Sequence, residues 1–150
     1  MAVKAVPDGY HSVTPYLCVG GASDAIAFYV KAFGATEIMR MPGPDGKLGH
    51  AEIQIGDSRV MLADEFPPMN FRGPKTIGGS PVHIHIYVQD VDALYARALA
   101  AGAKTLRPIA DQFYGDRSVS VEDPFGHVWH LATHKEDLTP EEIAKRAPKR

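Results

Sequence analysis

The sequence predicts an α+β protein built from two tandem copies of a βαβββ module. The main observation is an internal repeat: the segment 24–26 (Asp-Ala-Ile) recurs at 92–94 (Asp-Ala-Leu), and 33–35 (Phe-Gly-Ala) recurs at 101–103 (Ala-Gly-Ala), in both cases 68 positions later. A fixed period indicates one supersecondary unit that occurs twice. Short β-branched and aromatic runs on both sides of each helical pattern supply the strands.

The elements of the two copies follow the same order. In the first copy, apolar residues at helical spacing between 25 and 33 predict a helix. Ser23 or Asp24 is expected to cap its start, and Gly34 to end it. In the second copy, a helix is expected from Asp92 to its stop at Gly102. The expected strands cover residues 13–19, 35–41, 48–55 and 59–63 in the first copy, and 82–88, 104–107, 117–122 and 127–133 in the second.

The chain is expected to form one domain, residues 1–150, because its length is typical of a single globular core. Thr139 and Glu142 form a capping box around Pro140, which predicts a last helix that is mostly charged. The expected parts are module one at about 12–65, a Pro- and Gly-rich linker at 64–80, module two at about 81–134, and a C-terminal helix at about 139–147.

Composition excludes several classes of function. Hydrophobic residues make up 45% of the chain and charged residues 23%, and the net charge is −2. Because basic residues are not in excess, we expect neither a nucleic-acid nor a membrane partner. No apolar run reaches the length of a membrane span, and residues 1–12 lack the apolar core of a signal peptide. The single cysteine, Cys18, fits a reducing compartment, so a cytoplasmic location is expected.

Several motifs resemble the vicinal-oxygen-chelate superfamily, which includes glyoxalase I, extradiol dioxygenases, fosfomycin-resistance proteins and bleomycin-binding proteins. The resemblance covers roughly residues 12–134. It rests on the aromatic pair Phe28-Tyr29 followed by Phe33-Gly34, on Gly102, and on Asp-Pro-Phe-Gly at 123–126. The segments 44–52, 112–117 and 132–137 resemble the PhnB-like branch. The resemblance implies that the two modules form a curved mixed sheet around a cleft.

The resemblance also implies a site for one divalent ion, Zn, Ni, Fe or Mn, held by the first and last strands of each module. In the second module these positions fall on His83 and His130, which are suitable ligand types. In the first module they fall on Thr14 and on Met61 or Leu62, which are not. The candidates for a third ligand are Glu52, Glu65 and His50. The alternative is that His83 and His130 are hydrogen-bonded residues of the cleft and bind no metal.

Other polar and aromatic side chains are candidates for binding a small molecule. His50 and Glu52 share one strand face and form a possible acid/base pair. Tyr114 offers apolar surface, and Arg117 a charged fork for carboxylate or phosphate, unless Asp116 pairs with it. Phe71 and Trp129 could add a stacking wall. The residues expected to contact a ligand are Thr14, His50, Glu52, His85, Tyr114, Arg117 and Trp129.

Three functions are compatible with these patterns. The first is a metal-free or weakly metallated protein that binds a small, partly aromatic or anionic molecule. The second is a divalent-metal-dependent lyase, isomerase or dioxygenase that uses His83 and His130. The third, the least favoured, is a structural or partner protein. Glyoxalase I activity itself is not expected, because the carboxylate that the resemblance implies near position 61 is absent. By analogy with two-module relatives, we expect a homodimer.

Overall fold

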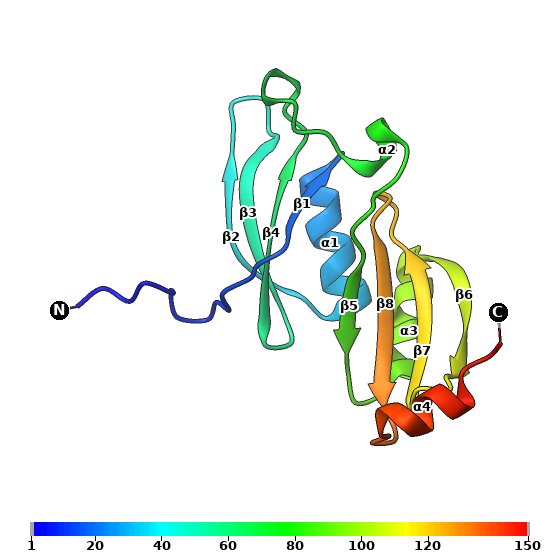
Figure 1. Cartoon of the computed structure of the whole chain (residues 1–150). Coiled ribbons are helices and arrows are strands. Elements are labelled where there is room, and N and C mark those ends of the chain that lie inside the picture. The colour runs from blue at the N-terminus through cyan, green and yellow to red at the C-terminus, as the bar shows by residue number, and fades with distance from the viewer. Residues whose placement is uncertain (1, 150) are drawn as a thin grey trace. The chain divides into compact units, whose positions relative to one another are not determined.

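The computed structural model of the protein describes residues 2–149 (Figure 1). The chain divides after Gly79 into two compact units, and each is described by itself. The first unit contains β1 (Tyr16–Val19), α1 (Ala22–Phe33), β2 (Thr36–Pro42), β3 (Leu48–Ile55), β4 (Ser58–Asp64), the 3₁₀ turn η1 (Pro67–Met69) and α2 (Pro74–Ile77). The second contains β5 (Ile84–Tyr87), α3 (Val91–Ala101), β6 (Lys104–Asp111), β7 (Asp116–Glu122), β8 (Val128–His134) and α4 (Pro140–Arg146).

Each unit is a four-stranded mixed sheet with the same topology. The strand orders are β1-β4-β3-β2 and β5-β8-β7-β6. The first strand runs parallel to the last, and the other neighbours are antiparallel. Helix α1 packs on the first sheet and α3 on the second (Figure 1). The prediction of an α+β fold with tandem βαβββ modules is therefore confirmed.

The strands differ from the predicted ranges mainly at their ends. β1 and β5 begin two to three residues later than predicted, at Tyr16 and Ile84. β6 continues to Asp111 although it contains Pro108. A proline is tolerated there because β6 is an edge strand, where one side of the backbone needs no partner in the sheet.

Side-chain alternation gives each sheet two different faces. One face, here called the helix-covered face, is apolar and buried; it carries Leu17, Ile53 and Leu62 in the first unit and Val121 and Leu131 in the second. The opposite face, here called the helix-free face, receives the alternate residues of every strand. Strand alternation therefore decides which of the predicted polar residues can contact a ligand, because only the helix-free face is open to one.

The start of α1 differs from the prediction. The helix begins at Ala22, after Gly21, and neither Ser23 nor Asp24 caps it. The Asp64 carboxylate at the end of β4 takes that role: it accepts from the backbone N–H groups of Gly21 at 2.8 Å and Ala22 at 2.9 Å. It also accepts from Leu48 N–H at 2.8 Å. One carboxylate thus joins the helix start to β3 and β4.

The second unit uses Thr133 near the end of β8 for the same purpose. Its hydroxyl accepts from Val91 N–H, the first residue of α3, at 2.9 Å, and donates to Val88 C=O at 2.9 Å. Asp90 adds an ordinary side-chain cap to Ala93 N–H. The helices end where predicted, with Gly34 and Gly102 in the left-handed conformation.

Local hydrogen bonds stabilise α4 and the linker between the units. In α4, the Thr139 hydroxyl accepts from Glu142 N–H at 3.2 Å. The linker contains an antiparallel bridge between Phe66 and Phe71, which closes a small loop around η1. No helix within residues 2–149 is long and apolar enough to cross a membrane.

We expect Asp64→Ala to lower the free energy of unfolding by about 2–4 kcal/mol, because it leaves three backbone donors without their acceptor. Urea denaturation measures the change. Asp57→Ala, in the exposed β3–β4 turn, is the matched control and should change stability by no more than about 0.5 kcal/mol. Equal effects of the two substitutions would contradict the assigned role of Asp64.

Candidate functional site

The helix-free face of the first unit carries three side chains joined by hydrogen bonds. The register places Tyr16 of β1, Met61 of β4 and Glu52 of β3 in one row across the sheet. His50 lies two residues before Glu52 and projects from the same face. The Tyr16 hydroxyl lies 2.7 Å from His50 Nδ1, and His50 Nε2 lies 2.7 Å from Glu52 Oε2. Tyr16, His50 and Glu52 are called the Tyr–His–Glu chain below.

The direction of the Tyr–His–Glu chain follows from its carboxylate end. An ionised carboxylate only accepts hydrogen bonds, so His50 Nε2 donates to Glu52, and in the neutral imidazole His50 Nδ1 then accepts the hydroxyl proton of Tyr16. Burial, followed by the nearby Cys18 thiol, raises the pKa of Tyr16. The Tyr16 hydroxyl is therefore protonated at neutral pH. Its oxygen still has a lone pair with which it can accept a hydrogen bond from a ligand.

Tyr16 also lines a cavity of about 830 Å³ in the first unit. The apolar part of this cavity includes Tyr16, Phe66, Met69 and Phe71. The Tyr16 and Phe71 rings meet edge to face, with their centroids 5.8 Å apart. Because the bridge between Phe66 and Phe71 closes the loop that carries Met69, these side chains are held at the cavity wall. We call this space the aromatic cavity.

The aromatic cavity has an acidic lining. Asp45, Asp64 and Glu65 contribute carboxylates, whereas Lys47 is the one basic lining residue among those described. Burial, then the charges of Glu65 and Asp64, raises the pKa of the buried Cys18 thiol to about 11. Cys18 is thus a protonated thiol at neutral pH, which is a poor nucleophile. The cavity favours uncharged or cationic molecules with an aromatic part.

The helix-free face of the second unit carries a cluster of histidines. His83 Nδ1 lies 2.9 Å from His130 Nε2, and His130 Nδ1 lies 2.7 Å from the Ser120 hydroxyl. The His85 and His130 rings lie with their centroids 6.2 Å apart. Burial, then His83, His85 and Arg107, lowers the pKa of His130. His130 is consequently a neutral imidazole at pH 7.

Two side chains of this histidine cluster could ligate a metal ion. His83 Nδ1 and His130 Nε2 face one another, as two ligands of one ion must, and a neutral imidazole is the form that binds metal. Within residues 2–149, no group of three or more His, Cys, Asp or Glu side chains is arranged to hold an ion. Of the three candidates for a third ligand, Glu52 and His50 bond to each other, and Glu65 accepts from Thr76 at 2.6 Å.

A second polar group lies further along the same face. The buried carboxylate of Asp116 accepts from the Tyr87 hydroxyl at 2.7 Å and contacts His134 Nδ1 at 2.7 Å. His134 Nε2 also contacts Asp137 at 2.7 Å. These two carboxylates raise the pKa of His134, and the bond to Asp116 raises that of Tyr87. The group ties β5, β7 and β8 to the segment before α4.

A family comparison agrees with the fold. The model of the glyoxalase/bleomycin resistance protein/dioxygenase superfamily matches residues 9–131. The chain belongs to this superfamily. The protein Mb0911c of Mycobacterium bovis is 46% identical over 146 residues, which cover 95% of this chain and 93% of the relative.

Solved structures of other proteins share the fold. The product of the Arabidopsis thaliana gene At5g48480 is 28% identical with a TM-score of 0.68, over 82% of this chain and 98% of the relative. The PhnB protein of Bacillus cereus has a TM-score of 0.65 at 18% identity, over 82% of this chain and 99% of the relative. The predicted relation to this superfamily, with a PhnB protein among its structural neighbours, is confirmed.

The register determines which first-unit residues occupy the positions of the second-unit histidines. Tyr16 pairs with Met61 as His85 pairs with His130. Met61, and not Leu62, therefore corresponds to His130, because Leu62 points into the core. Thr14, two residues before Tyr16, corresponds to His83 in the same way but lies outside β1. The first unit of this superfamily member thus carries a Tyr–His–Glu chain in place of the histidine cluster.

Two residues expected to bind a ligand lie on the helix-covered face. Trp129 is fully buried, and its indole N–H donates to Asp123 at 2.8 Å. Arg117 pairs with Asp92 and Asp111, and not with Asp116. The physical reason is alternation: Trp129 is adjacent to His130, and Arg117 to Ser118, so both point to the opposite face. In the structure these two side chains hold the fold, and neither lines the aromatic cavity or the hollow beside His85.

The sequence predicted some residues of the sites and missed others. The predicted residues His85 and Tyr114 lie together at a hollow of about 160 Å³ on the second unit. Arg107 lines the same hollow, and Tyr16 lines the aromatic cavity, yet neither was a candidate. The signal for Tyr16 was available, since it shares a strand parity with Thr14. No sequence signal identified Arg107, because its place depends on register shifts in β6.

We expect His130 to titrate below about 6.5 and His134 above it, which NMR of the imidazole Cε1–H signals would measure. A lowered pKa means that the unfolded state binds the proton first, so the His130 contribution to stability is lost as pH falls below about 6.5. The His134 contribution has the opposite sign: it is complete below that pH and is lost as pH rises through the folded-state pKa. Coincident titration of both residues would contradict these environments.

Proposed function

We propose that the protein binds a small, partly aromatic molecule in the aromatic cavity of its first unit, and that this binding needs no metal. The observation that carries the proposal is the group of aromatic and apolar side chains, Tyr16, Phe66, Met69 and Phe71, around one cavity of about 830 Å³. A space of this size, with an apolar wall and few polar groups, is typical of small-molecule sites. Three of these side chains, Tyr16, Phe66 and Met69, are exposed and so available to a ligand.

The polar groups of the cavity indicate the charge and orientation of the ligand. Three carboxylates and one ammonium group line it, which favours a cationic or uncharged molecule over an anion. The Tyr16 oxygen can accept a hydrogen bond because its own proton is directed to His50. A ligand with an aromatic part and an N–H or O–H donor would therefore satisfy both the wall and the Tyr–His–Glu chain.

The test uses proflavine, a cationic aromatic fluorophore, and 1-anilinonaphthalene-8-sulfonate, an anionic one. Proflavine should bind the unmodified protein more tightly, as measured by fluorescence titration. Phe71→Ala should weaken proflavine binding by roughly tenfold, because it removes one aromatic contact and the support of Tyr16. The control is Phe113→Ala, which removes a partly exposed aromatic ring from the second unit and should leave the affinity unchanged. Tighter binding of the anionic probe, or equal losses in both variants, would refute the proposal.

A second candidate function is favoured by the approach of His83 to His130. We propose it as the alternative: a divalent-metal-dependent lyase, isomerase or dioxygenase in which these imidazoles are two ligands. When bound, such an ion would polarise the oxygen atoms of a substrate. Ser120 would support it, because its hydroxyl bonds to His130 Nδ1 and thereby orients the ring, as outer-shell partners of metal-bound histidines do.

Isothermal titration with Zn²⁺ or Ni²⁺ tests this alternative without any assay of activity. If the two imidazoles are ligands, His83→Ala with His130→Ala should weaken ion binding by at least the roughly tenfold to hundredfold that loss of an outer-shell partner costs. His11→Ala removes an exposed imidazole and serves as the control. An unchanged affinity in the double variant would exclude His83 and His130 as ligands.

A further inference from the structure

A row of four polar side chains crosses the helix-free face of the second unit. Arg107 of β6 pairs with Ser120 of β7, Ser120 with His130 of β8, and His130 with His85 of β5. The row therefore includes every strand of this sheet. All four side chains line the hollow of about 160 Å³. We call it the Arg107 hollow.

The Arg107 hollow has hydrogen-bond donors that are not used within the protein. Over residues 2–149, the Arg107 guanidinium has neither an ion-pair partner nor a hydrogen-bond partner. The side chains of His85, Gln112, Tyr114 and Ser118, which also line the hollow, form no hydrogen bonds within that range. Arg117, on the opposite face, has two carboxylate partners. His85, Arg107 and Tyr114 are exposed, so their donors face solvent and can reach an acceptor ligand.

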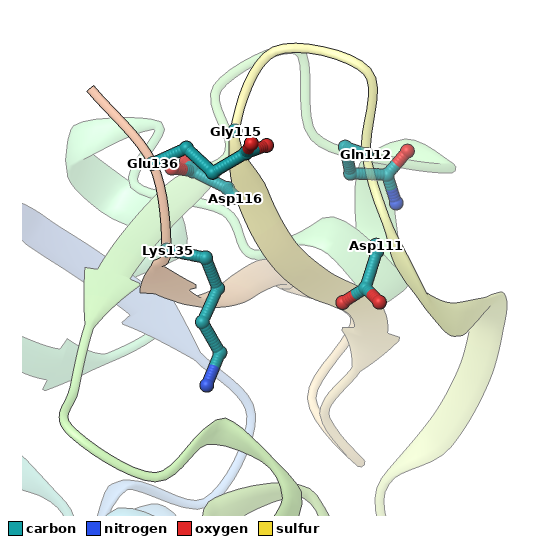
Figure 2. A pocket seen from close by; sticks show the side chains of 6 residues that line it. All are labelled: Asp111, Gln112, Gly115, Asp116, Lys135 and Glu136. Carbon is teal, nitrogen blue, oxygen red and sulfur yellow. The ribbon is translucent and has the colours of Figure 1, made fainter. Parts of the chain in front are cut away.

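No carboxylate lines the Arg107 hollow among the described residues. Three nearby acidic side chains line a different hollow, of about 300 Å³, which Figure 2 shows. Asp111, Asp116 and Glu136 line it together with Lys135. Gln112 is the one residue that lines both hollows. The Arg107 hollow thus has no acidic lining residue, although acidic residues outnumber basic ones, 18 to 16, in the whole chain.

The size and charge of the Arg107 hollow limit what it can hold. Its volume of about 160 Å³ corresponds to about five water molecules at roughly 30 Å³ each. Arg107 supplies one permanent charge, in a planar fork that matches a carboxylate. Pro108 and the Tyr114 ring offer apolar surface for a short or planar tail.

We propose that the second unit binds a small monocarboxylate in the Arg107 hollow, with the Arg107 guanidinium as the partner of the carboxylate. His85, Gln112, Ser118 and Tyr114 lie around it as further donors. This site goes beyond the proposed function, since it uses neither the aromatic cavity nor the nitrogens with which His83 and His130 face each other.

The first unit shows that the row of polar side chains at the Arg107 hollow is not a general property of the fold. Its corresponding row consists of Met39, Glu52, Met61 and Tyr16. Met39 replaces the guanidinium, and the carboxylate of Glu52 would repel an anion. The same sheet register therefore gives an oxyanion site in the second unit and excludes one in the first.

Isothermal titration of the full chain with sodium benzoate tests the proposal, with inorganic phosphate as the comparison. Benzoate should bind, and more tightly than phosphate, which carries more than one charge near neutral pH. Arg107→Gln should weaken benzoate binding by about tenfold or more, because a charge-assisted hydrogen-bond pair is lost. Arg107→Lys should restore part of it, since a lysine keeps the charge but not the fork.

The matched control is Lys104→Gln, which removes one positive charge from the same strand at an exposed position and should leave benzoate affinity unchanged. Amide NMR shifts should change at Ser118, Ser120 and His130 on adding benzoate, and not in the first unit. The proposal is overturned if benzoate does not bind, if Arg107→Gln binds it as well as the parent protein, or if Lys104→Gln weakens it equally. None of these outcomes depends on proflavine binding, so the two proposals fail separately.

Discussion

The fold depends on a polar side chain near the end of each last strand that holds the first turn of the helix. In the first unit Asp64 accepts three backbone N–H groups, two of them at the start of α1. In the second unit Thr133 accepts one from α3 and returns its own proton to Val88 C=O. Because β4 and β8 are central strands of their sheets, this contact sets each helix over one face. The other face is left free for chemistry.

The two free faces have diverged although their backbones match. Equivalent positions hold Tyr16, Met61 and Glu52 in the first unit, and His85, His130 and Ser120 in the second. In the first unit, His50 joins Tyr16 and Glu52 into a hydrogen-bonded chain beside an aromatic wall. In the second unit, the His85 imidazole and the Arg107 guanidinium have no hydrogen-bond partner among the described residues. A duplicated module can therefore carry two kinds of recognition, because alternation fixes where side chains project but not what they are.

The sequence predicted much of the fold and part of the two sites, and each wrong or missing prediction has a specific physical cause. The repeat, the glycine stops and the amphipathic patterns predicted both modules, and period-two alternation placed His50 with Glu52 and His83 with His85. The same rule, applied to Trp129 beside His130, would have removed Trp129 from the candidates. Asp64 as the cap of α1 could not be predicted, since it lies 42 residues from Ala22 along the chain. Arg107 depended on irregular pairing that no local pattern reports.

That irregular pairing also bears on how the protein behaves in a crowded solution. β6 is an edge strand, and its register shifts on both sides of Arg107, with Pro108 directly after it. A regular edge offers unpaired N–H and C=O groups to any other strand, which is a common route to aggregation. A kinked edge with a proline and an unpaired charge is a poor template for such growth. The distortion that presents the guanidinium therefore also protects the open side of the sheet, and a variant that straightened β6 would lose both properties together.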